Sequence, residues 1–219
     1  MIFEHRVMAQ RWGYANINTG ALWYRVKHGI TDPNSFDEPA KATAMENEYF
    51  VHLDLEVPYG GWMEDRSTLH RGTYLQKNGL WIHTGIDAWA RASTIVLAVA
   101  EGDVVYQGSD WPMIGGWGYH IIQKINFRGQ PHALVYAHLA HQPVNKRSRM
   151  FRKDDIIGHI GTEKDNGHWS QHLHLQLFAD VEGVTDWEAF SQQMDGYVRP
   201  DECAKWAAKC PDPTPLIFK

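Results

Sequence analysis

The sequence has few cysteines, no long apolar run and no excess of basic residues. No segment approaches the ~18 consecutive apolar residues of a membrane span, so we expect no integral membrane segment. The net charge of −5 and the lack of a basic patch argue against a nucleic-acid partner. The first residues, "MIFEHRVMAQRWGYAN", lack the apolar core of a secretory signal. Either the protein stays inside the cell or a signal has been removed.

The two cysteines are Cys203 and Cys210, and no CxxC metal motif exists. If "DECAKWAAKC" were helical throughout, they would lie ~10 Å apart along the helix axis. That separation exceeds the ~7 Å limit between the Cα atoms of a disulfide. Pro211 follows directly, however, and a helix that ends before Cys210 would allow a bridge. Both alternatives stay open.

The chain of 219 residues, of which 43% are hydrophobic, is typical of one globular domain or of one domain with an extension. From residue 49 onward, short β-branched or alternating segments are separated by Gly, Asp and Asn clusters. The clearest are "YFVHLDLEV", "TIVLAVAEGDVVYQG", "YHIIQKINF", "HALVYAHL" and "HLHLQLF". This pattern predicts a mainly β fold of sandwich or barrel type.

Helical signals are few. Residues 1–48 are polar and predict irregular structure with a loop and a short helix. In "TDWEAFSQQM", Thr185 and Glu188 form a capping-box pattern that predicts a helix, and "DECAKWAAK" predicts a second short helix. We therefore expect short peripheral helices around the β core.

Among 13 histidines, His172 and His174 are two residues apart in the alternating segment "SQHLHLQLF". Residues i and i+2 of a strand share a face, so both imidazoles point to one side and Leu173, Leu175 and Leu177 point to the other. Taken alone, a solvent-exposed strand face carrying two chance histidines is the favoured interpretation.

A second cluster, "HTGID", places His83 and Asp87 four residues apart around a glycine. In an extended segment these side chains share a face, and a histidine of the HxH segment would complete a His₂Asp set. Three such ligands with one open position are typical of a catalytic zinc. By themselves, His83 and Asp87 are better explained as a surface hydrogen-bonded pair.

A third element, "YAHL", adds His138 within a strand-like run. An imidazole beside a metal site can accept a proton from water or stabilise charge on a carbonyl oxygen. If one histidine of the HxH segment binds the metal, the other histidine would share that work.

The order HxxxD, YxHL and HLH resembles the lysostaphin-type (LytM-like) zinc endopeptidases, which cut peptide bonds of bacterial peptidoglycan. The resemblance extends to "WIHTGIDAWARASTIVLAVAEGDVVYQG", "GWGYHIIQKI", "LVYAHLAHQPVNKRSRMFRKDDIIGHIGTEKDNG" and "CPDPTPLIF". It covers roughly residues 55–219. It implies an antiparallel β-sheet or sandwich of the duplicated hybrid motif (barrel-sandwich hybrid) type, with a groove across a sheet.

The resemblance also implies roles for single residues. His83, Asp87 and His174 match the zinc ligands, for one Zn²⁺ per chain, and His138 and His172 match the catalytic histidines that are not ligands. The implied reaction is hydrolysis of peptidoglycan peptide cross-links by a zinc-activated water. Hydrogen-bond acceptors behind the ligating imidazoles should orient them, but the sequence does not identify these acceptors.

The sequence departs from the family pattern at a few places. Leu175 and Gln176 replace the usual Phe and Glu of HLHFE, and the loop "TEKDNGHWSQ" is longer than usual. Trp169 in this loop is expected either to stack on substrate or to pack within the loop. The remaining histidines are expected to be structural or exposed; they include His70, His120, His132, His141 and His159.

Residues 1–54 lie outside the resemblance. We expect an N-terminal extension that wraps the domain of residues 55–219 or occludes its groove with a polar side chain. The leading function is a zinc metalloendopeptidase, and the alternative is a non-catalytic groove-binding regulator of other cell-wall hydrolases. A further alternative, a carrier or sugar-transport regulatory domain with a related hybrid fold, would need neither HxxxD nor a third histidine strand. Because peptidoglycan lies outside the cytoplasm, we expect a periplasmic or secreted protein.

Overall fold

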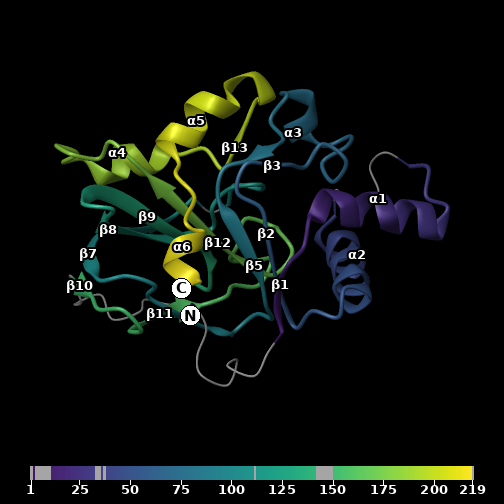
Figure 1. Ribbon diagram of the computed structural model, residues 1–219, viewed down its shortest axis with the longest axis horizontal. Helices are drawn as coiled ribbons and strands as arrows, with labels where there is room; N and C mark the ends of the chain where they lie inside the picture. Colours follow the sequence, from purple (N-terminus) through teal and green to yellow (C-terminus); the bar gives the residue numbers. More distant parts are fainter. Residues whose placement is uncertain are drawn as a thin grey trace.

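The computed structural model describes residues 2, 11–32, 36, 38–110, 112–141 and 150–218. An eight-stranded sheet forms the centre of the molecule (Figure 1). All neighbouring strands in it are antiparallel except the first pair, which is parallel. In spatial order the strands are β1 (Trp12–Tyr14), β2 (Val57–Gly60), β5 (Ile86–Trp89), β12 (His172–Phe178), β9 (Gln130–Leu139), β8 (Tyr119–Phe127), β7 (Gly102–Ser109) and β10 (Met150–Phe151). The predicted mainly β fold is confirmed.

Two small antiparallel sheets accompany the central one. One pairs β6 (Ile95–Leu97) with β11 (Ile156–His159), and packs into the core cluster of the central sheet. The other has three strands in the order β13 (Tyr197–Val198), β4 (Ile82–His83) and β3 (Glu64–Asp65). This second sheet carries the histidine of the "HTGID" segment and connects directly to β5.

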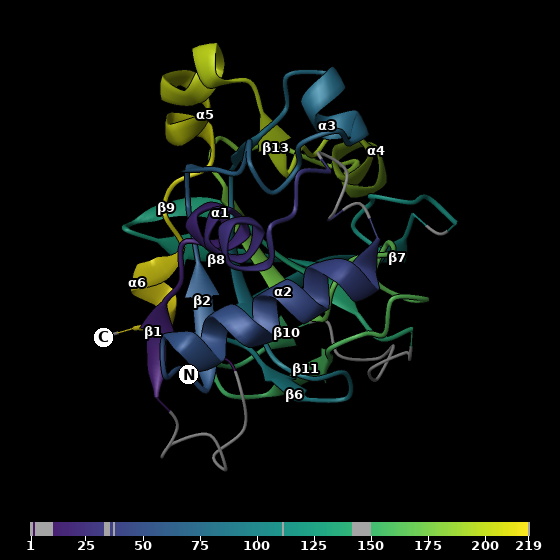
Figure 2. The ribbon, with the colours of Figure 1, turned by 90° about the vertical axis from the view of Figure 1, so that its right-hand side faces the viewer.

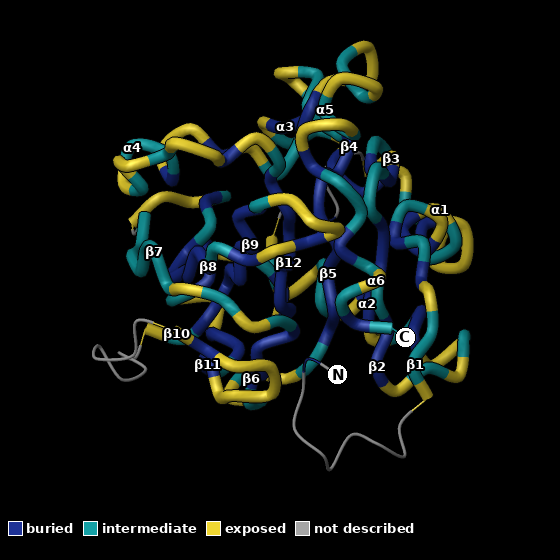
Figure 3. The backbone as a smooth tube through the Cα atoms, turned by 60° about the vertical axis from the view of Figure 1, so that its left-hand side comes forward, coloured by how far each residue is buried: buried dark blue, intermediate teal, exposed yellow. Residues whose placement is uncertain are grey.

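Strand β12 occupies the middle of the central sheet, between β5 and β9. Leu173, Leu175 and Leu177 are fully buried in the largest core cluster, as the alternation predicts. The opposite face is also covered, because the exposed fractions of His172 and His174 are only 7% and 4%. The alternative of a solvent-exposed histidine face is therefore wrong, and Figure 3 shows the buried course of β12.

The N-terminal region differs from the prediction of irregular structure with one short helix. It contains α1 (Ile17–His28) and α2 (Pro39–His52), which pack beside β1 and β2 (Figure 2). The Asn16 side chain accepts a hydrogen bond from the Thr19 backbone N–H, and Gly29 at φ 61° ends α1 in the left-handed conformation.

The strand predicted from residue 49 is wrong over residues 49–52, which form the last turn of α2. Tyr49 and Phe50 join a core cluster with Ile17 of α1 and Trp89 of β5. Burial against this cluster outweighs the local β preference of the aromatic and β-branched residues. The two N-terminal helices thus share a core with the central sheet.

Short helices surround the remaining edges: α3 (Tyr74–Lys77), α4 (Trp187–Gln192), the 3-10 helix η2 (Pro200–Glu202), α5 (Cys203–Lys209) and α6 (Thr214–Ile217). The predicted α4 exists, but its cap is Asp186, whose side chain accepts from the Ala189 N–H, instead of Thr185. Among the described helices, none has the length and apolar character to cross a membrane.

The two cysteines are free thiols. Cys203 begins α5, and Cys210 lies directly after its last residue. Cys210 is buried, and its sulfur accepts a hydrogen bond of 3.3 Å from Gln176 Nε2 on β12. The disulfide alternative is not adopted, and Cys210 instead contacts the strand that carries the paired histidines.

Candidate active site

The "HTGID" segment leaves β4 at His83 and enters β5, where Asp87 pairs with His174 of β12. The turn between them brings the His174 ring close to the backbone at Gly85. A Cβ atom at position 85 would lie 2.6 Å from His174 Cε1 and 2.7 Å from the Leu175 carbonyl oxygen. Only glycine allows this approach, so the central glycine of the motif brings its histidine and aspartate against the HxH strand.

His83, Asp87 and His174 each point one ligand atom at a common point, and these atoms lie within 4.8 Å of one another. His83 Nε2 is 3.1 Å from His174 Nδ1 and 3.5 Å from Asp87 Oδ1. His174 Nδ1 is 2.9 Å from the same carboxylate oxygen. Tetrahedral zinc ligands at about 2.0–2.1 Å would be separated by roughly 3.3 Å, so these spacings suit a single zinc ion.

In each ligand ring, the nitrogen that faces away from the cluster makes a hydrogen bond, and this bond determines which nitrogen carries the proton. His83 Nδ1 donates to the Gly61 carbonyl oxygen at 3.1 Å, and His174 Nε2 donates to Gln176 Oε1 at 2.9 Å. The facing atoms, His83 Nε2 and His174 Nδ1, therefore both present lone pairs beside a carboxylate. Three acceptors that face one another in a buried site repel unless a cation lies between them, so this donor set fits a divalent metal.

Gln176, where the family pattern has glutamate, acts as the acceptor for His174. Its amide orientation is set by its neighbours: Thr84 Oγ1 donates to Oε1 at 3.1 Å, and Nε2 donates to the Asp195 carbonyl oxygen at 3.0 Å. The glutamine thus offers only its oxygen to the His174 ring. This neutral acceptor orients the imidazole as a carboxylate would.

Arg66, which the sequence interpretation missed, holds the other side of Asp87. Its Nη1 donates to Asp87 Oδ2 at 2.6 Å, and its Nε donates to Glu64 Oε2 at 2.9 Å. Burial alone would raise the pKa of Asp87, but the positive charge of Arg66 holds that pKa well below its usual range. Asp87 is therefore ionised, with one oxygen held by Arg66 and the other facing the two imidazoles.

His172 and His138 lie beside this set, with ring centroids 4.6 Å apart. His172 Nδ1 donates to the Ser170 carbonyl oxygen at 2.7 Å, which leaves Nε2 as an acceptor 3.4 Å from Asp87 Oδ1. Burial lowers the pKa of His172, and it lowers the pKa of His138 further. Both rings are consequently neutral near pH 7 and able to accept a proton.

His138 has an unusual backbone, with φ at 64° in the left-handed region. A non-glycine residue in this region costs about 1–2 kcal/mol and is enriched at functional sites. Its backbone is fixed by hydrogen bonds to the Trp117 carbonyl and from the Gly161 N–H. A hydrogen bond with the Asn166 backbone also acts on the His138 ring and partly opposes the effect of burial on its pKa.

A groove of about 530 Å³ opens over these residues and contacts all five predicted site residues. Trp169 of the long loop lines it; its Nε1 donates to the Gly116 carbonyl oxygen at 2.9 Å, and its ring lies beside those of His138 and Tyr197. Tyr197 of β13 and Asp195 also line the groove, and the Tyr197 ring centroid lies 6.4 Å from that of Trp169. The site is thus a polar centre in an open, partly aromatic channel.

The other histidines divide into structural and peripheral ones. His120 is buried and its Nε2 lies 2.7 Å from Ser191 Oγ, and His132 Nδ1 donates to the Gln130 carbonyl oxygen. His141 contacts Tyr119 edge to face, and His159 is half-buried on β11. His70 differs, because it is buried close to Arg66 and Tyr197.

Comparison with known proteins adds a family match. Residues 81–185 match the profile described as "Peptidase family M23", and the matched segment contains all five predicted site residues. No curated protein sequence matches the chain.

Several solved structures resemble part of the chain. The catalytic domain of a point mutant of the prophage-encoded M23 protein EnpA from Enterococcus faecalis is 23% identical, with a TM-score of 0.39, over 55% of this chain and 77% of that one. Lysostaphin is 24% identical, with a TM-score of 0.42, over 66% of this chain and 56% of its own length. The chain therefore spans about half of the lysostaphin structure, and the finding that bears on function is the family match over residues 81–185.

Proposed function

Through residues 81–185 the chain belongs to peptidase family M23, and from this premise we propose that it is a zinc-dependent endopeptidase that hydrolyses peptide cross-links of bacterial peptidoglycan. The observation that carries the proposal is the convergence of two imidazole lone pairs and one carboxylate oxygen at a buried point. Two further histidines, both neutral, border the same point. A structural metal site would not need them.

We assign His83 Nε2, Asp87 Oδ1 and His174 Nδ1 as the ligands of one Zn²⁺ per chain. A bound zinc supplies Lewis acidity, which polarises a carbonyl oxygen and makes a water molecule more acidic. The Gly61 carbonyl and Gln176 keep the two rings in the tautomer that ligation needs. Arg66 keeps Asp87 ionised and occupies the oxygen that faces away from the cluster.

The proton is handled by His172 and His138. His172 donates its Nδ1 proton to the Ser170 carbonyl, so its Nε2 lone pair is available to take a proton from the attacking water. His138, whose ring lies beside those of His172 and His174, is suited to stabilise the oxyanion or to return the proton to the leaving amine. No covalent intermediate with the enzyme is required.

For the domain organisation, we propose that residues 55–219 form the peptidase domain and that residues 1–54 wrap it. The wrapping arrangement is supported by the shared core, in which Ile17, Met45 and Tyr49 pack with Trp89 of β5. The Glu46 carboxylate on α2 is bound elsewhere, because it accepts a hydrogen bond of 2.8 Å from Ser170 Oγ. We also propose a periplasmic or secreted location, because the substrate lies outside the cytoplasm.

Metal analysis combined with digestion of purified peptidoglycan tests the proposal. The wild-type protein should bind about one zinc per chain and release muropeptides. His83→Ala and Asp87→Ala should lose zinc, whereas His172→Ala should keep zinc and lose activity. A wild-type protein that holds zinc, binds peptidoglycan and releases nothing would support the non-catalytic regulator instead.

A further inference from the structure

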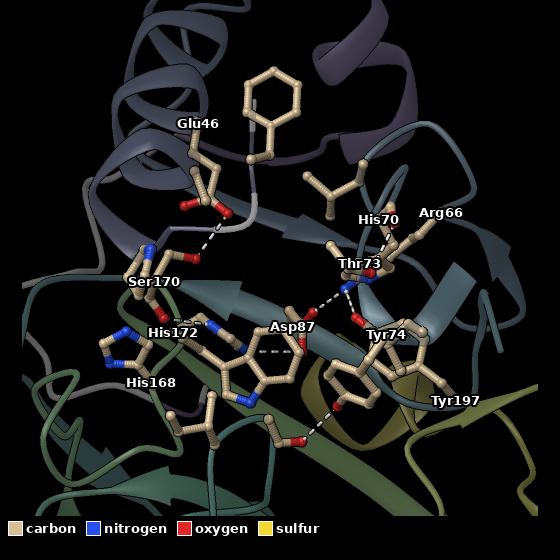
Figure 4. Close-up of a pocket in the computed structure, with 18 of the residues that line it drawn as sticks. Glu46, Arg66, His70, Thr73, Tyr74, Asp87, His168, Ser170, His172 and Tyr197 are labelled. Carbon is tan, nitrogen blue, oxygen red and sulfur yellow. Dashed lines mark hydrogen bonds and ion pairs between the residues drawn. The ribbon is translucent and has the colours of Figure 1, made fainter. Parts of the chain in front are cut away.

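The side chain of His172, to which we assign proton transfer, is connected to the N-terminal helices by hydrogen bonds. Its Nδ1 donates at 2.7 Å to the carbonyl oxygen of Ser170, which lies in the loop just before β12. The Ser170 hydroxyl donates at 2.8 Å to Glu46 Oε1 on α2 (Figure 4). Ser170 therefore bonds the ring of His172 with one polar group and α2 with the other.

The helix that supplies this carboxylate lies outside the segment that matches family M23. Ser170 and His172 belong to residues 81–185, whereas α2 spans Pro39–His52. The contact joins residues that are 124 positions apart in the sequence, and it depends on the packing of the N-terminal helices against the central sheet. The family segment thus receives from outside itself a polar support for one of its proton-transfer residues.

The surroundings of these three residues make the bond between Glu46 and Ser170 important for their order. All three are buried, with exposed fractions of 5% for Glu46, 8% for Ser170 and 7% for His172. They also line a cavity of about 330 Å³, so close packing does not restrain them on that side. A buried hydroxyl that loses its acceptor is costly. The position of Ser170 therefore depends on its hydrogen bonds.

Within its own loop, Ser170 has only a weak restraint. Asn166 Nδ2 lies 3.4 Å from the Ser170 carbonyl oxygen and makes a shorter bond, of 3.0 Å, to the Trp169 carbonyl oxygen. The carbonyl that orients His172 is thus held loosely by the loop itself. The bond from the Ser170 hydroxyl to Glu46 fixes the same residue from the other side.

Helix α2 also reaches His172 through ring packing. The Phe50 ring, in the last turn of α2, has its centroid 5.2 Å from that of Trp89, and the Trp89 centroid lies 6.1 Å from that of His172. Trp89 is the direct partner of His172 in the pairing of β5 with β12. Two separate routes from α2, one polar and one aromatic, therefore end on the same imidazole.

The position of this imidazole matters for the proposed reaction. His172 Nε2 lies 3.4 Å from Asp87 Oδ1, beside the metal ligands. A general base has to lie within hydrogen-bond reach of the water that it deprotonates, and a displacement of about 1 Å can reduce the rate roughly 100-fold. A support that fixes the ring therefore contributes to turnover.

We propose that Glu46 is a positioning residue that acts through Ser170 to hold His172 in place for proton transfer. The inference rests on the proposed peptidase function. It makes α2 part of the catalytic unit. Loss of the Glu46 acceptor lowers kcat, whereas zinc content depends on the three ligands and KM depends on the groove.

Kinetics on cross-linked muropeptides, which a muramidase releases from purified peptidoglycan, test the proposal. Glu46→Leu should lower kcat about tenfold or more, with KM and zinc content changed by less than about twofold. Glu46→Gln keeps an acceptor oxygen and should restore kcat to within about twofold of wild type. The matched control is Glu48→Leu on the same helix, whose carboxylate pairs with Lys27 and His28 at the surface, and it should leave kcat unchanged.

Ser170→Ala removes the hydroxyl but keeps the carbonyl that binds His172. It is a smaller change than Glu46→Leu, and it should lower kcat by a similar factor. Because the two residues act as one unit, the double variant should be no slower than the slower single variant. Losses that multiply in the double variant would contradict a shared role.

A spectroscopic measurement on the zinc-loaded protein with ¹⁵N-labelled histidine does not depend on turnover. The Nδ1–H signal of His172 is identified by its loss in His172→Ala. It should exchange slowly with solvent in wild type and Glu46→Gln, and about tenfold faster in Glu46→Leu. Unchanged kcat and unchanged exchange in both Glu46→Leu and Ser170→Ala would overturn the positioning role and leave the peptidase function standing. If the wild type hydrolyses nothing, the peptidase function fails, and the exchange rates alone decide whether Glu46 positions His172.

Discussion

Glu46 links the N-terminal helices to the active site through a buried carboxyl group. Its side chain accepts a hydrogen bond of 2.8 Å from Ser170 Oγ, and the Ser170 carbonyl accepts from His172 Nδ1. Burial raises the pKa of Glu46 from 4.5 to about 7, although the bond from Ser170 opposes the shift. Glu46→Gln, which keeps an acceptor oxygen but cannot ionise, tests this linkage.

The direction in which stability changes with pH follows from the number of protons that the folded and unfolded states bind. Between pH 4.5 and pH 7 the folded protein retains a proton that the unfolded chain has lost, so stability falls as the pH rises through this window. The difference between the two pKa values corresponds to roughly 3 kcal/mol of unfolding free energy. The wild-type protein should lose this amount between about pH 4 and pH 8 through this group alone. The Glu46→Gln variant should not show this loss of unfolding free energy.

The assay is urea unfolding followed by tryptophan fluorescence, with a chelator present, at a series of pH values. The difference in unfolding free energy between Glu46→Gln and wild type should shift in favour of the variant by roughly 3 kcal/mol between about pH 4 and pH 8. Glu48→Gln, on the same helix but solvent-accessible and paired with Lys27 and His28, should show no such gain. Parallel stability curves for wild type and Glu46→Gln would refute the raised pKa.

Variants at three further residues test the groups that hold the proposed metal ligands in place. Arg66→Met removes the guanidinium from Asp87 and should weaken zinc binding by about 10–100-fold, measured by competition with a chromophoric chelator; unchanged affinity would contradict its positioning role. Gln176→Leu should weaken zinc binding by about tenfold, whereas Gln176→Glu should retain it; equal affinities would show that the acceptor is dispensable. Gly85→Ala should both destabilise the fold and lose zinc, because its methyl group collides with the His174 ring; a normal melting temperature and zinc content would contradict the geometry.

Local patterns in the sequence were enough to predict the strand that carries the paired histidines. The alternation in "HLHLQLF" assigned Leu173, Leu175 and Leu177 to the core, where the structure has them. It did not reveal that the histidine face is also covered, because the covering residues come from distant segments. Burial of His172 and His174 depends on long-range packing that periodicity does not encode.

Arg66 and Glu46 could not be found from local pattern. Arg66 reaches Asp87 because β3 pairs with β4, a contact set by the tertiary arrangement. Glu46 reaches Ser170 from a helix whose last turn, with Tyr49 and Phe50, has local β preference. The unusual φ of His138 likewise depends on its backbone partners instead of its residue type.

The central claim is that the five residues form a working zinc peptidase centre. The most direct measurement is the release of new amino groups from purified peptidoglycan by the wild-type protein, before chelation, after chelation and after zinc is restored. We predict release that stops on chelation and returns with about one equivalent of zinc. No release from a folded protein that holds one zinc per chain would contradict the claim.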